Sequence, residues 1–127
     1  MQKKIYYHDT DCGGVVYYSN YLKYMEEGRT EYFAARGASI KELAAQGVMF
    51  VVARVEIDYK APAFYGDTLW VETVFSKVHK VKIEVEHAVK NQSGELICQS
   101  KTLLVCVDKE IKPKAIPEEL RKKLGGG

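Results

Sequence analysis

Apolar side chains recur at steps of three and four residues between positions 20 and 36, and this spacing predicts the longest helix of the chain. The residues that set the period are Leu22, Met25, Gly28 or Arg29, Tyr32 and Phe33. Ser19 or Asn20 can cap the start of the helix, and Gly37 suits its end. Because a glycine inside a helix costs about 1 kcal/mol relative to alanine, we expect Gly28 to mark a close approach to a sheet or a ligand.

A shorter helix is predicted by the capping-box pattern Ser39-Ile40-Lys41-Glu42 and is expected to end at Gly47. The period then changes to two residues, which is typical of strands. Strands are predicted at 49–59, 69–78, 82–90 and 96–107, with a short one at 4–7. Asn91-Gln92-Ser93-Gly94 forms the turn of a hairpin between the last two. A helix followed by several antiparallel strands indicates the α+β class, with the helix on one face of the sheet.

The strand at 49–59 also predicts which side chains share a face. Alternation turns six of them to one side, namely Met49, Val51, Ala53, Val55, Ile57 and Tyr59. The opposite side carries Arg54, Glu56 and Asp58. A strand this long and apolar is rarely left unpaired at a sheet edge in a soluble monomer, so we expect the protein to form oligomers.

The length of 127 residues suits one domain, 1–127, in which about 113–127 form a C-terminal tail or short helix. The net charge of +2, from 19 basic and 17 acidic residues, does not favour binding of nucleic acid. No stretch approaches ~20 apolar residues, so we expect no membrane span, and the charged N-terminus does not resemble a signal peptide. The three cysteines, Cys12, Cys98 and Cys106, lack CxxC or zinc-ligand spacing, which predicts reduced thiols and a cytoplasmic location.

The segment between the short strand and the long helix carries the strongest chemical signal. Two carboxylates, Asp9 and Asp11, are followed by Gly13-Gly14 just before the helix start. A carboxylate at this place lies close to the free backbone N–H groups of the helix, which can hold a developing oxyanion. The segment therefore predicts an active site, although the two aspartates can also serve only as turn formers.

Four short segments resemble the acyl-CoA thioesterases of the hot-dog fold. They are Asp9-Thr10-Asp11, Gly14-Val15-Val16-Tyr17, Ser19-Asn20-Tyr21 and Glu27-Gly28-Arg29. The chain is most similar to the branch that holds 4-hydroxybenzoyl-CoA thioesterase and the Tol-Pal-associated thioesterases, and the resemblance extends more weakly to Val107. It implies a five-stranded antiparallel sheet that wraps the long helix, hydrolysis of an acyl-CoA to free acid and CoA, and no metal or redox cofactor.

The resemblance also assigns roles near the helix start. Asp11 becomes the catalytic candidate, as general base or as nucleophile, and the backbone N–H of Tyr18 the expected polariser of the thioester carbonyl. The Tyr18 side chain matches the hydroxybenzoyl type, because the Tol-Pal-associated members commonly carry histidine there. Asp9 is expected to be structural or to support the catalytic group. A thiol of pKa ~8.5 leaves as thiolate without strong acid assistance, so one carboxylate and one oxyanion site can suffice. In another hot-dog branch the acid comes from the helix, which makes Glu27 the fallback.

A basic turn between two strands is the candidate site for the CoA nucleotide. Its cations are Lys77, His79, Lys80 and Lys82. The corresponding turn in the hydroxybenzoyl-type enzymes faces the nucleotide, whose phosphates favour basic partners. Arg54 and Lys60 are weaker candidates for the same role, and a solvated basic rim is the alternative explanation for the turn.

The resemblance further implies a homodimer whose sheets join edge to edge, or a homotetramer formed by two such dimers. The active site is then expected at the dimer interface. One chain would supply Asp11 and the helix start, and the other would supply residues around 51–59.

Other sites and protein classes fit less well. His8, Asp9 and Asp11 do not complete a metal shell, because no second cluster of His or Cys accompanies them. A hot-dog dehydratase would need a histidine on the long helix, which has none. His87 is expected to be a buried core histidine. A non-catalytic acyl-CoA-binding or scaffold protein of the same fold stays open, as does the acyl group, whether short, long or aromatic.

Overall fold

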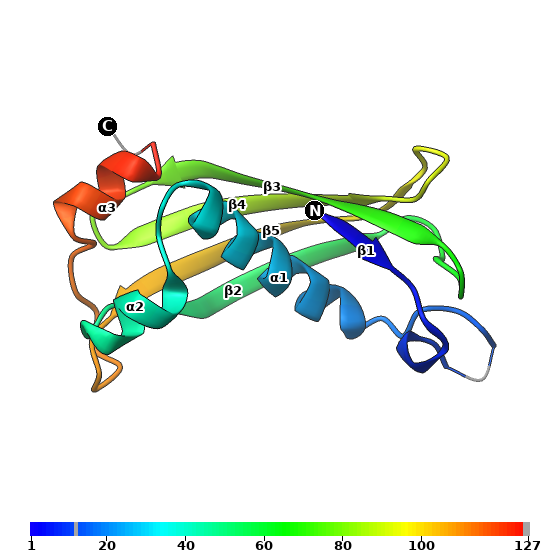
Figure 1. Cartoon of the computed structure of the whole chain (residues 1–127), viewed down its shortest axis with the longest axis horizontal. Helices are drawn as coiled ribbons and strands as arrows, with labels where there is room; N and C mark the ends of the chain where they lie inside the picture. The colour runs from blue at the N-terminus through cyan, green and yellow to red at the C-terminus, as the bar shows by residue number, and fades with distance from the viewer. Residues whose placement is uncertain (12, 126–127) are drawn as a thin grey trace.

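Five antiparallel strands form one sheet in the order β1-β3-β4-β5-β2, and a long helix crosses one of its faces (Figure 1). The computed structural model describes residues 1–11 and 13–125. The strands are β1 (Gln2–Lys4), β2 (Met49–Tyr59), β3 (Thr68–Val78), β4 (Lys82–Lys90) and β5 (Leu96–Val107). The helices are α1 (Asn20–Ala35), α2 (Ile40–Ala45) and α3 (Glu118–Lys123), with one 3₁₀ turn, η1 (Tyr7–Asp9). The predicted α+β architecture is confirmed.

The start of the chain differs from the sequence prediction. The strand expected at 4–7 ends at Lys4, and the chain winds into η1 instead. The reason is local, because the backbone N–H of Tyr6 donates a hydrogen bond to Asp9 Oδ2 at 2.9 Å and draws the chain into a turn. The Ser19 side chain also makes no capping hydrogen bond at the start of α1, whereas Ser39 caps α2 as predicted by accepting from the Glu42 N–H.

The prediction for the faces of β2 is half wrong. A bulge shifts the register against β5 between Val52 and Arg54. Beyond the bulge, Ile57 and Tyr59 pair with Ser100 and Cys98, which are buried beneath α1, as predicted. Before the bulge the parity is reversed, so that Phe50, paired with the buried Cys106, takes the helix side in place of Met49 and Val51. One extra residue in a strand turns every preceding side chain to the other face.

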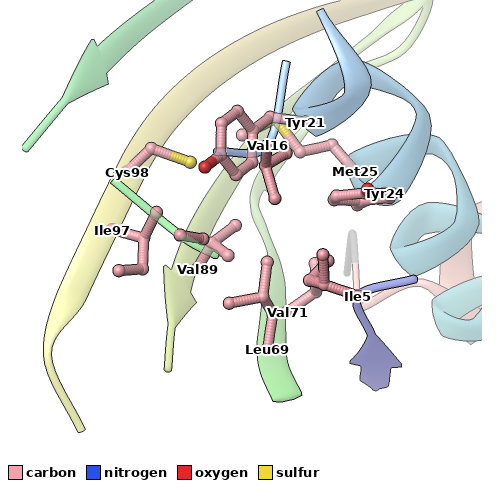
Figure 2. Close-up of a cluster of buried hydrophobic side chains, with 11 residues drawn as sticks. Ile5, Val16, Tyr21, Tyr24, Met25, Leu69, Val71, Val89, Ile97 and Cys98 are labelled. Carbon is pink, nitrogen blue, oxygen red and sulfur yellow. The ribbon is translucent and has the colours of Figure 1, made fainter. Parts of the chain in front are cut away.

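The core lies between α1 and the sheet and has two parts. The first, drawn in Figure 2, packs residues of the early turns of α1, such as Tyr24 and Met25, against residues of β3, β4 and β5, such as Val71. The second joins Phe33 near the end of α1 to residues of α3. Ile116, Leu120 and Leu124 are buried in this second part, so the C-terminal segment closes one end of the core.

Gly28 lies where α1 closely approaches the sheet at β3, one of the two reasons predicted for a glycine within the helix. A Cβ atom at position 28 would stand 2.7 Å from Thr73 Oγ1 and 3.1 Å from Val71 Cγ1. Any side chain there would push the helix off the sheet, so the cost of a glycine within α1 is balanced by closer packing. None of the helices in the described part of the chain is long and apolar enough to cross a membrane.

Candidate active site

The loop that precedes α1 folds back on itself as a narrow hairpin. The Tyr17 N–H donates to the Asp9 carbonyl at 3.1 Å, and the Asp11 N–H donates to the Val15 carbonyl at 3.0 Å. The tip is closed by the Gly14 N–H, which donates to the Asp11 carbonyl at 3.1 Å. Gly14 has φ +75°, a left-handed conformation that favours glycine. These bonds place the segment that carries Asp11 beside the segment that leads to Tyr18.

The Asp11 carboxylate is exposed at the tip of this loop in the single chain. Its Oδ1 accepts a hydrogen bond from the Gly13 N–H at 2.9 Å. This contact is the bond of a turn-forming aspartate. It leaves the carboxylate at the surface, where it can meet water or a substrate carbonyl, so Asp11 has the access that a base or nucleophile needs.

Tyr18 lies in the turn that leads into α1, two residues before the helix begins, with its backbone N–H available. The N–H groups of Asn20, Tyr21 and Leu22 donate to the carbonyls three residues earlier, which begins the helix with tight turns. For Tyr18 itself, no acceptor of the N–H is found among residues 1–11 and 13–125. An uncapped helix start of this kind is a donor for a developing oxyanion.

The Tyr18 side chain is turned outward and meets the end of β2. The residue is 60% exposed, and its ring lies edge-on to the ring of Tyr59, with centroids 6.3 Å apart. The Tyr59 hydroxyl donates to the Tyr18 carbonyl oxygen at 3.4 Å. The end of β2, and with it the following Lys60, therefore lies at the same end of the molecule as the helix start.

Asp9 is bound on several sides by groups of its own chain. Its side chain is buried, and both carboxylate oxygens are used: Oδ2 accepts from the Tyr6 N–H and Oδ1 from the Tyr24 hydroxyl, at 2.9 and 2.8 Å. Its carbonyl oxygen accepts from the Asn20 side chain at 2.8 Å. Tyr24 was not predicted to belong to the site, and Asn20 was predicted only as a possible cap of the helix. A signal for Asn20 was present, because an amide side chain at a helix start reaches backbone groups outside the helix.

The basic turn lies at the other end of the sheet. The loop with Asp11 is joined to the segment before β3, since Val15 pairs with Phe64, whereas His79 follows the end of β3. A strand of 11 residues spans roughly 35 Å. Figure 1 shows the β3–β4 turn next to α3 and the loop before α1 at the opposite end. Within one chain, Lys80 and Lys82 are therefore not brought together with Asp11.

Several of the candidate cations and acids already have partners. His79 Nε2 lies 2.6 Å from Glu84 Oε2, and this hydrogen bond, together with Lys77 and Lys82 nearby, lowers the pKa of Glu84. Arg54 forms an ion pair with its strand neighbour Glu56.

Two further side chains named from the sequence, Glu27 and His87, are ion-paired and buried, respectively. Glu27, the fallback acid, lies 3.4 Å from the ammonium of Lys3 on β1. His87 is buried, as expected, and burial together with Arg29 lowers its pKa to about 4. In the described ranges, no group of three His, Cys, Asp or Glu side chains is arranged to hold a metal ion.

A long helix across one face of a five-stranded antiparallel sheet, with an acidic loop at the helix start, defines a hot-dog thioesterase fold. The chain belongs to the thioesterase-like superfamily, whose family model matches residues 6–124. It is 34% identical over 118 residues to the acyl-CoA thioester hydrolase YbgC of Escherichia coli O6:H1, covering 92% of this chain and 88% of that protein. It is 36% identical over 120 residues to the acyl-CoA thioesterase YbgC of Haemophilus influenzae, covering 93% and 88% of the two chains.

A solved structure shows the same fold. The crystal structure of DHNA-CoA thioesterase from Staphylococcus aureus matches with a TM-score of 0.91 at 26% identity, covering 98% of this chain and 89% of that one. The predicted hot-dog fold and the predicted class of enzyme, a thioesterase, are confirmed.

Proposed function

We propose that this chain hydrolyses an acyl-CoA to a free acid and CoA, with Asp11 as general base or nucleophile and the Tyr18 N–H as oxyanion donor. The observation that carries the proposal is the loop before α1, on which an exposed carboxylate and an uncapped helix start are held by the same set of hydrogen bonds. The relatives named acyl-CoA thioesterases support the same class of substrate.

Either route gives the same products. As a base, Asp11 takes a proton from a water molecule that attacks the carbonyl carbon, and the C–S bond then breaks to release the CoA thiolate. As a nucleophile, Asp11 forms a mixed anhydride while the thiolate leaves, and water then hydrolyses the anhydride. In both routes negative charge builds on the carbonyl oxygen, where an N–H fixed in place lowers the barrier most.

The complete site requires a second copy of the chain. In the described residues β2 pairs only with β5, so the other edge of an 11-residue strand is open. Exposed apolar side chains lie along it, including Val52, Val55 and Tyr59. A groove of about 260 Å³ between α1 and β2 lies beside this edge, with Arg29, Phe33 and Val52 in its lining. These features support a homodimer through paired β2 strands, alone or as half of a homotetramer.

Such a dimer would bring the basic turn of one copy close to Asp11 of the other. A two-fold axis that pairs β2 antiparallel with β2 reverses the direction of the second sheet. The β3–β4 turn of the second copy then comes to the end of the assembly that holds Asp11. Its Lys80, Lys82 and His79 would bind the phosphates of the CoA nucleotide, with Arg54 and Lys60 along the joined strands as further contacts.

The two lysines are the best placed of these cations. Both are exposed, and among the described residues no carboxylate lies within 4.0 Å of either ammonium. His79 would have to exchange its hydrogen bond with Glu84 for one with a phosphate. We also propose the cytoplasm as the site of action, because Cys98 and Cys106 are free, buried thiols.

The test is hydrolysis of a series of acyl-CoAs of varied chain length, with a benzoyl ester included, by wild type, Asp11→Asn and Asp9→Asn. We expect Asp11→Asn to lower kcat by about 10²-fold or more while thermal stability stays near wild type, since the side chain is exposed. Asp9→Asn should also lower stability, because its carboxylate is buried and both of its oxygens accept hydrogen bonds.

Three results would contradict parts of the proposal. Near-normal turnover by Asp11→Asn would refute the role of Asp11, and Glu27 would be the next residue to test. Hydrolysis by a monomer would exclude the shared site. Binding of acyl-CoA without hydrolysis by the wild type would favour the acyl-CoA-binding scaffold.

A further inference from the structure

The first two turns of α1 bind Asp9 through its side-chain carboxylate and through its backbone carbonyl. The residue is 7% exposed, and its Oδ1 accepts the Tyr24 hydroxyl hydrogen at 2.8 Å. Its carbonyl oxygen accepts from Asn20 Nδ2 at 2.8 Å and from the Tyr17 N–H at 3.1 Å. Asn20 is the first residue of α1, and Tyr24 lies one turn further along. We call Asp9, Asn20 and Tyr24 the Asp9 clamp.

Tyr24 makes its contact from inside the core. Only 2% of the residue is exposed, and its ring packs in the cluster of Figure 2 with Ile5 and Met25. Burial, reinforced by the hydrogen bond to Asp9, raises the pKa of Tyr24, so its hydroxyl keeps its proton and remains a donor. The ammonium of Lys3 lies 5.3 Å from the ring centroid and helps to fix the ring from the side of β1. A donor held this firmly fixes the position of the carboxylate that it meets.

Asn20 controls the other side of the loop. Its amide and the Tyr17 N–H share one acceptor, the Asp9 carbonyl, so the residue before Tyr18 and the first residue of α1 are bound to the same atom. Asp9 is also two residues from Asp11 along the chain. A shift of Asp9 would therefore move Asp11 and the Tyr18 N–H relative to each other.

We propose that Tyr24 and Asn20 are positioning residues, which act through Asp9 to set the separation between the Asp11 carboxylate and the Tyr18 N–H. This inference rests on the proposed function, because the separation matters only if both groups meet one thioester. Neither side chain needs to touch the substrate. A misplacement of about 1 Å from a change outside the reacting groups is enough to cost roughly 10²-fold in rate.

The experiment compares Tyr24→Phe and Asn20→Ala with wild type. We expect kcat to fall by about 10-fold or more in each, whereas KM changes by less than about twofold, because contacts with bound CoA are intact. Two control variants lie elsewhere in the core: Tyr32→Phe also removes one hydroxyl, and Ile83→Val also removes buried volume. Both should keep the wild-type kcat even when their melting temperatures fall as far as that of Tyr24→Phe. A kcat that follows the melting temperature across all four variants would overturn the positioning role.

Two more measurements separate this inference from the proposed function. Amide hydrogen exchange at Asp11 and Tyr17 should become faster in both clamp variants and not in the controls, whether or not a substrate is known. Unchanged exchange would overturn the clamp. In an Asp11→Asn background, Tyr24→Phe should lower kcat by a smaller factor than in wild type, because the carboxylate that it positions is gone. A wild type that hydrolyses no acyl-CoA would refute the proposed function, and hydrogen exchange would still decide on the clamp.

Discussion

Gly28 on α1 faces Thr73 on β3 so closely that a Cβ atom at position 28 would lie 2.7 Å from Thr73 Oγ1. Thr73 is β-branched and has little freedom to rotate away. On helix propensity alone, Gly28→Ala should stabilise the protein by about 1 kcal/mol. The contact predicts the opposite sign, because overpacking of a core costs about 1–3 kcal/mol.

We therefore expect Gly28→Ala to lower the free energy of unfolding, as measured by denaturant titration, by about 1 kcal/mol or more. Thr30→Ala, exposed on the same helix, is the control and should leave stability equal or slightly higher. Adding Thr73→Ala to Gly28→Ala should recover part of the loss. A more stable Gly28→Ala protein would mean that α1 does not approach β3 as closely as described.

His87 makes the protein sensitive to acid. It lies in a row across the helix side of the sheet, between Thr73 on β3 and Ser100 on β5, and is 3% exposed. Burial is the larger cause, and Arg29 the second, that lowers its pKa from 6.5 to about 4. Because the folded pKa is below the unfolded one, the unfolded chain binds the proton first as pH falls. The contribution of neutral His87 to the free energy of unfolding is therefore complete above pH 6.5. It is lost progressively between pH 6.5 and 4, by an amount on the order of 3 kcal/mol.

The check is the free energy of unfolding of wild type and His87→Gln at pH 7.5 and at pH 5. We expect the substitution to cost stability at pH 7.5, since it disturbs the packing of the core. The decrease from pH 7.5 to pH 5 should be clearly smaller in His87→Gln than in wild type. Equal decreases in the two proteins would assign the acid sensitivity to other groups.

The open edge of β2 predicts the oligomeric state. Wild type should have the mass of a dimer or a tetramer by light scattering at micromolar concentration, whereas Val55→Lys should shift the protein toward monomer and lose hydrolysis. A charge at the centre of a strand-to-strand joint must be buried without a partner, which is costly. Val74→Lys is the matched control, because Val74 is an exposed valine on β3, away from this edge. A dimer that persists in Val55→Lys would place the interface elsewhere.

Much of the fold can be predicted because its elements are long and periodic. The helix expected at 20–36 is α1, and the four long strands lie within a residue or so of their predicted bounds. The errors occur where one contact overrides the period. The Asp9 carboxylate turns the chain into η1 after β1, and the bulge between Val52 and Arg54 reverses the parity of β2 with no Gly or Pro in the sequence to mark it.

The candidate site likewise has features that the local sequence predicts and features that only the tertiary structure determines. Asp11 and Tyr18 lie close in sequence on one loop, so their motif could be read directly. The contact of Tyr24 with the loop could not be predicted, because a tyrosine at an apolar position of a helix indicates only a core residue. Its hydrogen bond to Asp9 is visible only in the structure. The separation of Lys80 from Asp11 is set by the length of β3, and no local pattern reports which end of a sheet a turn will reach.

The basic turn yields the last prediction. If Lys80 and Lys82 of one chain meet the CoA phosphates at the Asp11 of another, their contribution is far from the reacting carbonyl and is shared by the ground and transition states. Replacing both with alanine should therefore raise KM for an acyl-CoA and leave kcat near wild type. The increase should be larger at low salt, because exposed charges are screened as ionic strength rises.

A pantetheine thioester of the same acid is the control substrate, since it lacks the nucleotide. Wild type and the double variant should hydrolyse it equally, so that the ratio of kcat/KM values for the two substrates isolates the nucleotide contact. Equal losses on both substrates would mean that the lysines support the fold or the acyl pocket. In that case the phosphates would be sought along the joined strands, where Arg54 would have to leave its ion pair with Glu56 and Lys60 lies next to Tyr59.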